Sequence, residues 1–161
     1  MNLLTTTALI GVFATALTDL WAIVRRRLLG IPFPDFGLVG RWIGHFPRGR
    51  LRHDRIAAAA PVNAERLIGW TAHYLIGVSF AALLPLVWGA QWLGHPTLAP
   101  ALILGLATVA APFLLMQPGM GAGIAASRTP NPAAARIQSI VTHAVFGLGL
   151  YAGALITRRF L

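Results

Sequence analysis

The chain has 161 residues, of which 57% are hydrophobic and 11% charged. Its 13 arginines, without any lysine, outnumber four acidic residues and give a formal net charge of +9. Ordinary soluble domains contain about 25% charged residues, so this composition, with a mean hydropathy of +0.70, excludes a water-soluble globular protein. The absence of cysteine excludes disulfides, thiolate metal sites and thiol catalysis.

The sequence predicts an all-α polytopic membrane protein with a single transmembrane domain over residues 1–161. Four apolar runs are each long enough to cross ~30 Å of hydrocarbon as a helix. They cover about 3–24, 67–93, 98–118 and 137–157. The first run is not expected to be a cleaved signal, because no basic residue precedes it and three arginines follow it.

The arginines predict the orientation of the spans. Nine lie in residues 25–66 and two more, Arg128 and Arg136, lie between the third and fourth runs, whereas only Arg158 and Arg159 lie on the opposite side. Because basic loops stay in the cytoplasm, both termini are predicted to lie outside. The orientation of the protein in the membrane and contact with anionic lipid headgroups explain the positions of the arginines, so nucleic-acid binding is not expected.

The connection between the first two spans is about 40 residues long and rich in apolar and aromatic residues. Residues 38–46 are expected to form a short amphipathic interfacial helix with Arg41 and His45 on its wet side. The alternative is a loop packed against the helix ends. Glu65 is expected to start the second span, where the helix dipole favours an acidic residue. The remaining ionisable residues expected to be interfacial or exposed are His45, His53, His95, Asp35 and Asp54.

The connection between the third and fourth spans, residues 116–132, has glycines at 119, 121 and 123 after Pro118. It is too apolar for a free loop. A tightly packed turn is favoured over a re-entrant element that lines a cavity. Thr129 or Asn131 as the cap, with Pro132 at the first helical position, predicts the start of the fourth span.

The second and fourth spans share a spacing of arginine, histidine and glycine. It occurs as Arg66, His73 and Gly77 and again as Arg136, His143 and Gly147. One interpretation is a duplicated helical hairpin, which would give a parallel repeat about an axis along the membrane normal. The other is coincidence, since glycine is common in this chain.

Ionisable side chains within the spans are the candidate functional residues, because they are costly in lipid and usually face the protein interior. Asp19, His73 and His143 each lie six or seven residues from an arginine, which places all three ~10 Å inside the cytoplasmic boundary. The candidate set for binding a ligand or a proton is Asp19, His73, His143, Gln117, Glu65 and Tyr151. The structural alternative is that each only links two helices by a hydrogen bond.

Three functions fit these residues. The first is binding or transport of a small ligand, ion or proton. The second is a metal or haem protein, with zinc on His73, His143 and Asp19, or haem b on the two histidines. In the haem case Gly77 and Gly147 would accommodate the ring, and Arg66 and Arg136 would lie near the propionates. The third is a structural or assembly partner without a ligand. No hydrolase, kinase or nucleotide-binding motif occurs, so enzyme activity is not favoured, and a homo-oligomer is expected because four short helices enclose little volume.

Several motifs resemble those of one family of small bacterial membrane proteins. They are Val39–His45, Gly69–Tyr74, Met116–Gly121 and Ser127–Pro130. That family is known only as a domain of unknown function. The resemblance extends over essentially the whole chain and implies an inner-membrane location and an approximate topology. It carries no functional residue with it.

Overall fold

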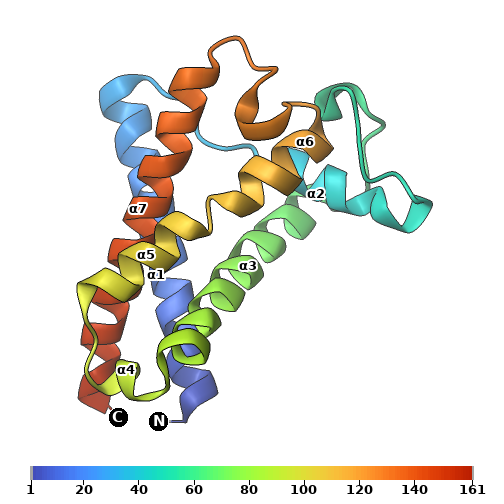
Figure 1. The fold of residues 1–161 in the computed structure, drawn as a ribbon. Coiled ribbons are helices and arrows are strands. Elements are labelled where there is room, and N and C mark those ends of the chain that lie inside the picture. Colours follow the sequence, from blue (N-terminus) through green and yellow to red (C-terminus); the bar gives the residue numbers. More distant parts are fainter. Residues whose placement is uncertain (1, 161) are drawn as a thin grey trace. The chain divides into compact units, whose positions relative to one another are not determined.

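All of the regular structure in the described residues is helical. The computed structural model describes residues 2–160, and no strand occurs among them. The α-helices are α1 (Leu3–Leu29), α2 (Phe36–Gly44), α3 (Glu65–Trp88), α4 (Gln91–Gly94), α5 (Leu98–Ala107), α6 (Gln117–Met120) and α7 (Pro132–Thr157) (Figure 1). The helical stretches long and apolar enough to cross a membrane are Leu3–Leu29, Glu65–Trp88, Leu98–Met120 and Pro132–Phe160. This confirms the predicted all-α fold with four membrane-spanning helices.

Local sequence signals set the ends of these helices. Asn2 caps α1 by accepting the backbone N–H of Thr5 at 2.8 Å, and Asn131 caps α7 by accepting that of Ala134 at 3.1 Å, as predicted. The second span was predicted to reach residue 93, which is wrong. Gly89 has a φ of +85°, a left-handed conformation that ends the helix, so α3 stops at Trp88.

The third span changes its helical geometry at a proline. After α5, residues Pro112–Met116 form a π-helical turn that leads into α6. Proline has no backbone N–H to donate, so a regular α-helix is disrupted there, and a wider turn is one way for the chain to continue. Gly121, with a φ of +97°, then ends α6. A short 3-10 turn, η4 (Ile124–Ala126), precedes α7.

The chain forms two compact units. Unit 1 contains Met1–Phe33, Tyr74–Thr108 and Ile140–Leu161, and unit 2 contains Pro34–His73 and Val109–Ser139. In unit 1, α1 and α7 run antiparallel, since Gly149 packs on Ala14 and Gly153 packs on Ile10. The start of α1 and the end of α7 therefore lie at the same end of this unit (Figure 1).

Glycines let the long helices of unit 1 approach closely. An added Cβ at Gly149 would lie 2.8 Å from the Cα of Ala14, and one at Gly105 of α5 would lie 2.5 Å from the Cα of Gly147 in α7. Small residues at such crossings are typical of membrane helix pairs. Gly149 of α7 and Gly105 of α5 are therefore positions where close helix packing requires a small residue. The buried apolar core of this unit consists of Ile10, Ala14, Ala81, Leu84, Trp92, Leu93, Ala101, Leu104, Phe146, Leu150 and Ala154.

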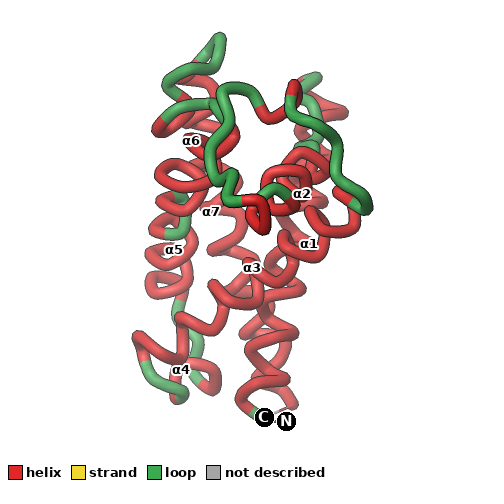
Figure 2. The backbone as a smooth tube through the Cα atoms, turned by 90° about the vertical axis from the view of Figure 1, so that its right-hand side faces the viewer, coloured by secondary structure: helices red, strands yellow, loops and turns green. Residues whose placement is uncertain are grey.

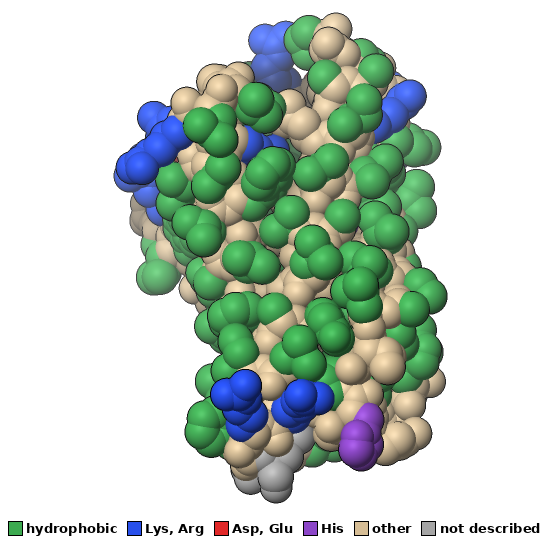
Figure 3. Space-filling view, turned by 90° about the vertical axis from the view of Figure 1, so that its left-hand side faces the viewer, with side chains coloured by type: hydrophobic (Ala, Val, Ile, Leu, Met, Phe, Trp, Pro, Cys, Tyr) green, Lys and Arg blue, Asp and Glu red, His purple; other side chains and the backbone are tan. Residues whose placement is uncertain are grey.

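Large apolar side chains also cover the outside of the spans. Leu86 is 77% exposed and Leu75 is 61% exposed, both on α3. Hydrophobic side chains are spread over much of the face that Figure 3 shows. Such a surface is suited to lipid acyl chains rather than to water.

Unit 2 is held by a close crossing of α2 over the first turns of α3. A Cβ added to Gly40 would overlap the carbonyl oxygen of Glu65, and one added to Gly69 would overlap that of Phe36. Long loop stretches lie beside α2 and α6 (Figure 2). The first connection therefore contains the predicted helix, but as α2 it covers Phe36–Gly44 rather than residues 38–46, and it is packed on α3.

The glycine-rich connection before α7 packs against the first connection within unit 2. The backbone N–H of His53 donates to the Gly119 carbonyl at 2.9 Å. A Cβ added to Gly119 would lie 2.6 Å from the Trp42 indole nitrogen, and one added to Gly121 would overlap the Asp54 carbonyl. Tight packing, which the sequence analysis favoured for this segment, is what the structure shows.

Candidate functional site

A carboxylate and a phenol join the first two spans inside unit 1. The Tyr74 hydroxyl of α3 donates to Oδ2 of Asp19 in α1 at 2.9 Å. The nearest hydroxyls of α1 are used within their own helix, since Thr15 donates to the Gly11 carbonyl at 2.8 Å and Thr18 to the Thr15 carbonyl at 2.7 Å. A threonine has one hydroxyl proton to donate. Neither hydroxyl therefore has a proton left to donate to Asp19.

The register of α1 against α3 explains this pairing. A Cβ on Gly77 would overlap the Thr15 hydroxyl, so the two helices touch at that level. One turn away along each antiparallel helix, Tyr74 meets Asp19. Sequence reasoning missed Tyr74, although its position three residues before Gly77 is the signal that could have identified it.

His73 lies in an aromatic cluster of unit 2. Its ring stacks on Phe36 with centroids 4.1 Å apart and meets Trp70 edge-on at 5.8 Å. Asp19 and His143 belong to unit 1, so the convergence of the three on one pocket stays a prediction. Within residues 2–160, no three histidine, aspartate or glutamate side chains are placed to hold one metal ion.

The predicted residues of the fourth span lie where α7 packs on its neighbours in unit 1. A Cβ on Gly105 of α5 would lie 2.7 Å from the His143 carbonyl, and one on Gly147 would lie 2.8 Å from the Ala101 carbonyl. Tyr151 packs partly buried against the apolar core. Neighbouring helices thus fill the space beside Gly147, as they do beside Gly77, so helix packing occupies the space that a haem ring would need at each glycine.

Three more predicted residues, Arg66, Arg136 and Gln117, lie in unit 2. Arg66 is exposed, and Arg136 donates through Nε to the Ala125 carbonyl at 2.8 Å, which closes the connection before α7. The Oε1 atom of Gln117 is buried and accepts no hydrogen bond. Of these three, only Gln117 has a buried polar atom whose bonding capacity is unused.

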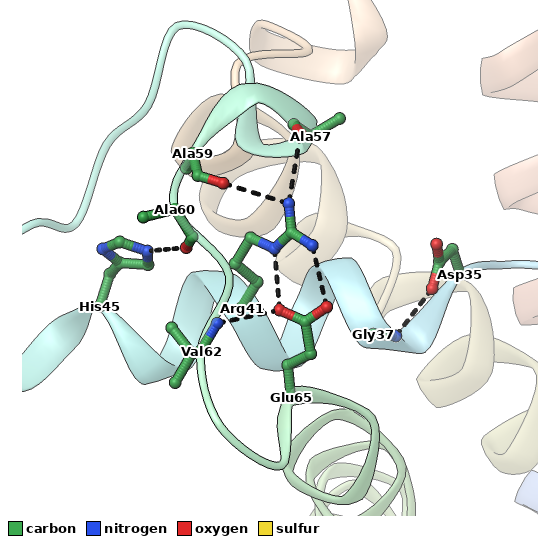
Figure 4. A network of polar contacts seen from close by, with 9 residues as sticks. All are labelled: Asp35, Gly37, Arg41, His45, Ala57, Ala59, Ala60, Val62 and Glu65. Atoms are coloured by element: carbon green, nitrogen blue, oxygen red, sulfur yellow. Dashed lines mark hydrogen bonds and ion pairs between the residues drawn. The ribbon is translucent and has the colours of Figure 1, made fainter.

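An ion pair anchors α2 to the start of α3 (Figure 4). Arg41 Nε and Nη2 donate to the two carboxylate oxygens of Glu65 at 2.8 and 2.9 Å. Its Nη1 donates to the carbonyls of Ala57 and Ala59, both at 3.2 Å. The hydrogen bond to Glu65 raises the pKa of Arg41. Glu65 Oε2 also accepts the backbone N–H of Val62 at 3.2 Å, so Glu65 starts the helix as predicted and carries an ion pair that was not predicted.

Two expectations about the first connection are wrong. The Arg41 side chain was expected on the wet side of its helix, yet only 13% of it is exposed because it faces Glu65. His45 was also expected in water or at the interface, yet it is 1% exposed, and its Nε2 lies 2.9 Å from the Ala60 carbonyl. His95 and Asp54, by contrast, are exposed as expected.

A match to one protein family extends over more than nine-tenths of the chain. The family is described as "Protein of unknown function (DUF2938)", and it matches residues 8–157. The chain belongs to the DUF2938 family. The resemblance inferred from the sequence motifs is thereby confirmed. No curated protein and no solved structure matches the chain.

Two polar arrangements of this DUF2938 member differ in what they can do chemically. In the Arg41–Glu65 pair both partners are fully engaged, which makes it a structural clamp. The Asp19–Tyr74 pair lies between two membrane-spanning helices and contains a carboxylate, a group that can accept a proton or contact a cation. The second arrangement is the candidate functional site.

Proposed function

We propose that this protein binds a proton or a small cation at Asp19 and moves it across the membrane. The observation that carries the proposal is the hydrogen bond of 2.9 Å between Asp19 in α1 and Tyr74 in α3. A carboxylate in a membrane span is unfavourable unless it is paired, and such groups commonly mark proton and ion pathways.

The pair also suggests how binding would affect the helices. The Tyr74 hydroxyl donates to Asp19 Oδ2, and this bond is strongest when the acceptor is an ionised carboxylate. Protonation of Asp19, or contact with a cation, weakens the bond between α1 and α3. Occupancy of the site is therefore coupled to the contact between two spans, as a transport cycle requires. We further propose that His73 and His143 extend the pathway as proton-carrying groups.

We propose a bacterial inner-membrane location, which the family resemblance implies, with both termini in the periplasm, an orientation that the arginine distribution of eleven to two supports. The most apolar windows of the spans are only 22–39% buried, which leaves apolar surface for lipid and for a second copy of the chain. We propose a homo-oligomer on this basis. Cross-linking in native membranes would yield a ladder of multiples of 17.2 kDa, and a band at the single-chain mass alone would contradict it.

Flux into liposomes tests the transport proposal. The purified chain is reconstituted with an internal pH-sensitive dye, and a K⁺ diffusion potential is imposed in Na⁺-containing and in Na⁺-free buffer. We expect flux above that of protein-free vesicles for the wild type, and flux reduced to the protein-free level for Asp19→Asn, because the amide cannot take up a proton or carry a charge.

The matched control is Ser79→Ala. Ser79 is exposed on α3 and donates to the Leu75 carbonyl of its own helix at 2.8 Å. This change removes a polar group of the same span without touching Asp19, and it should leave flux unchanged. Equal flux in wild type and Asp19→Asn would contradict the proposal. A wild type that carries no flux under either condition would contradict it as well and would favour a structural or assembly role.

A further inference from the structure

Two histidines of the first connection lie ring against ring inside unit 2. The imidazoles of His45 and His53 have centroids 4.9 Å apart and planes inclined by 75°. His45 is 1% exposed. Both ring nitrogens of His53 and the Nδ1 of His45 are buried and have no hydrogen-bond partner. Three buried polar atoms in one place therefore lack a partner, which is uncommon in native proteins.

The hydrogen bond to the Ala60 carbonyl determines the tautomer of the His45 ring. Its Nε2 lies 2.9 Å from the Ala60 carbonyl (Figure 4), and a carbonyl oxygen can only accept, so Nε2 carries the proton of the neutral ring. The lone pair is then on Nδ1, the buried atom without a partner. Donation from one ring nitrogen to a backbone carbonyl is the arrangement that orients a metal-binding histidine.

The backbone holds His53 in place. Its N–H donates to the Gly119 carbonyl at 2.9 Å. A Cβ on Gly121 would lie 2.8 Å from the His53 carbonyl oxygen, so only glycine permits this close approach. The second ring is thus positioned by α6 and the turn that follows it, independently of His45.

The spacing of the rings fits one shared ion. With metal–nitrogen bonds of about 2.0–2.1 Å, two imidazoles on a tetrahedral ion have ring centroids roughly 5 Å apart. The observed separation is 4.9 Å. We propose that His45, through Nδ1, and His53 bind one transition-metal ion of the class that prefers imidazole, such as Zn²⁺ or Ni²⁺.

The surroundings define the kind of site. No third histidine, aspartate or glutamate within residues 2–160 completes the set, so water or an exogenous ligand takes the other coordination positions, as in open metal sites. The arginines of the same connection are exposed, where solvent and salt screen their charge. They are Arg48, Arg50, Arg52 and Arg55.

Calorimetric titration with Zn²⁺ tests this site. The full chain carries an affinity tag without histidine, is purified in mild detergent and is stripped of metal by a chelator. We expect one Zn²⁺ per chain for the wild type. In His53→Phe, which keeps an aromatic ring and the backbone bond to Gly119, affinity should fall by more than about 10-fold, because loss of a ligand outweighs loss of an outer partner.

Two further variants make the result decisive. His45→Gln keeps an N–H donor for Ala60 but lacks the Nδ1 lone pair, so it should also lose the ion. His95→Phe removes an exposed histidine elsewhere and should bind as the wild type does. Melting curves of the metal-free proteins establish that each variant is folded. Absence of saturable binding by the wild type, or equal affinity in wild type and His53→Phe, would overturn the proposal and leave the two rings as a packing contact.

Discussion

Replacing Gly149 by alanine tests the close packing of α1 and α7. The added Cβ would lie 2.8 Å from the Cα of Ala14 and 3.1 Å from its Cβ. Carbon atoms in favourable contact are about 3.5–4.0 Å apart, so the helices would have to separate by roughly 0.7 Å. Overpacking costs about 1–3 kcal/mol, and the better helix propensity of alanine returns at most ~1 kcal/mol. The net expectation is a loss of about 1 kcal/mol of stability.

Thermal unfolding in detergent, followed by circular dichroism, measures this loss as a lower Tm. Gly153→Ala is the matched control on the same helix and against the same partner. Its added Cβ would lie 3.3 Å from Phe13 Cδ1 and 3.4 Å from the Cα of Ile10, which the neighbours can accommodate, so the Tm should stay or rise slightly. Equal Tm values for the two variants would refute the packing of α1 and α7 described above.

Three further variants use the same melting assay. Arg41→Lys should lower the Tm, because an ammonium cannot form the two parallel bonds to Glu65. Arg55→Lys, its control at an exposed position, should leave the Tm unchanged. Equal Tm values for the two variants would contradict the role of the Arg41–Glu65 pair as a clamp. Tyr74→Phe should lower stability by ~0.6 kcal/mol, the average for a hydrogen bond between membrane helices, and an unchanged Tm would contradict the pairing of α1 and α3. Asn131→Ala should cost about 1 kcal/mol through the lost cap of α7, and a wild-type Tm would contradict that cap.

The helices of this fold could be predicted because their signals are local. Apolar length identifies a span, and Asn131 followed by Pro132 marks a helix start. The end of α3 could not be predicted from hydropathy, since Trp92 and Leu93 continue the apolar run beyond Gly89. The positive φ of Gly89 ends the helix there, and composition does not report a dihedral angle.

The orientation of side chains in the first connection depended on distant partners. The sequence pattern predicted a helix at α2 but gave Arg41 the wrong direction, because Glu65 lies 24 residues further along the chain. The closeness of α2 and α3 comes from Gly40 and Gly69 together. Neither glycine alone indicates that polar side chains turn inward, which is why the burial of His45 was also missed.

The candidate site could be predicted only in part, because one of its features belongs to a single helix and the other to a contact between two helices. The run of arginines near the end of α1 predicts the depth of Asp19 in the membrane, which is a property of one helix. Its partner Tyr74 follows from how Gly77 packs on Thr15, a contact between two helices. Depth could therefore be inferred from the sequence, whereas the pairing required the structure.

Flux through Asp19→Asn and Asp19→Glu, compared in the same liposome preparation, tests the proposed role of the carboxylate most directly. The two side chains differ from the wild type by an amide in one case and one methylene in the other, so only the first removes the ionisable group. The account predicts flux at the protein-free level in Asp19→Asn and measurable flux in Asp19→Glu. Wild-type flux in Asp19→Asn would contradict it.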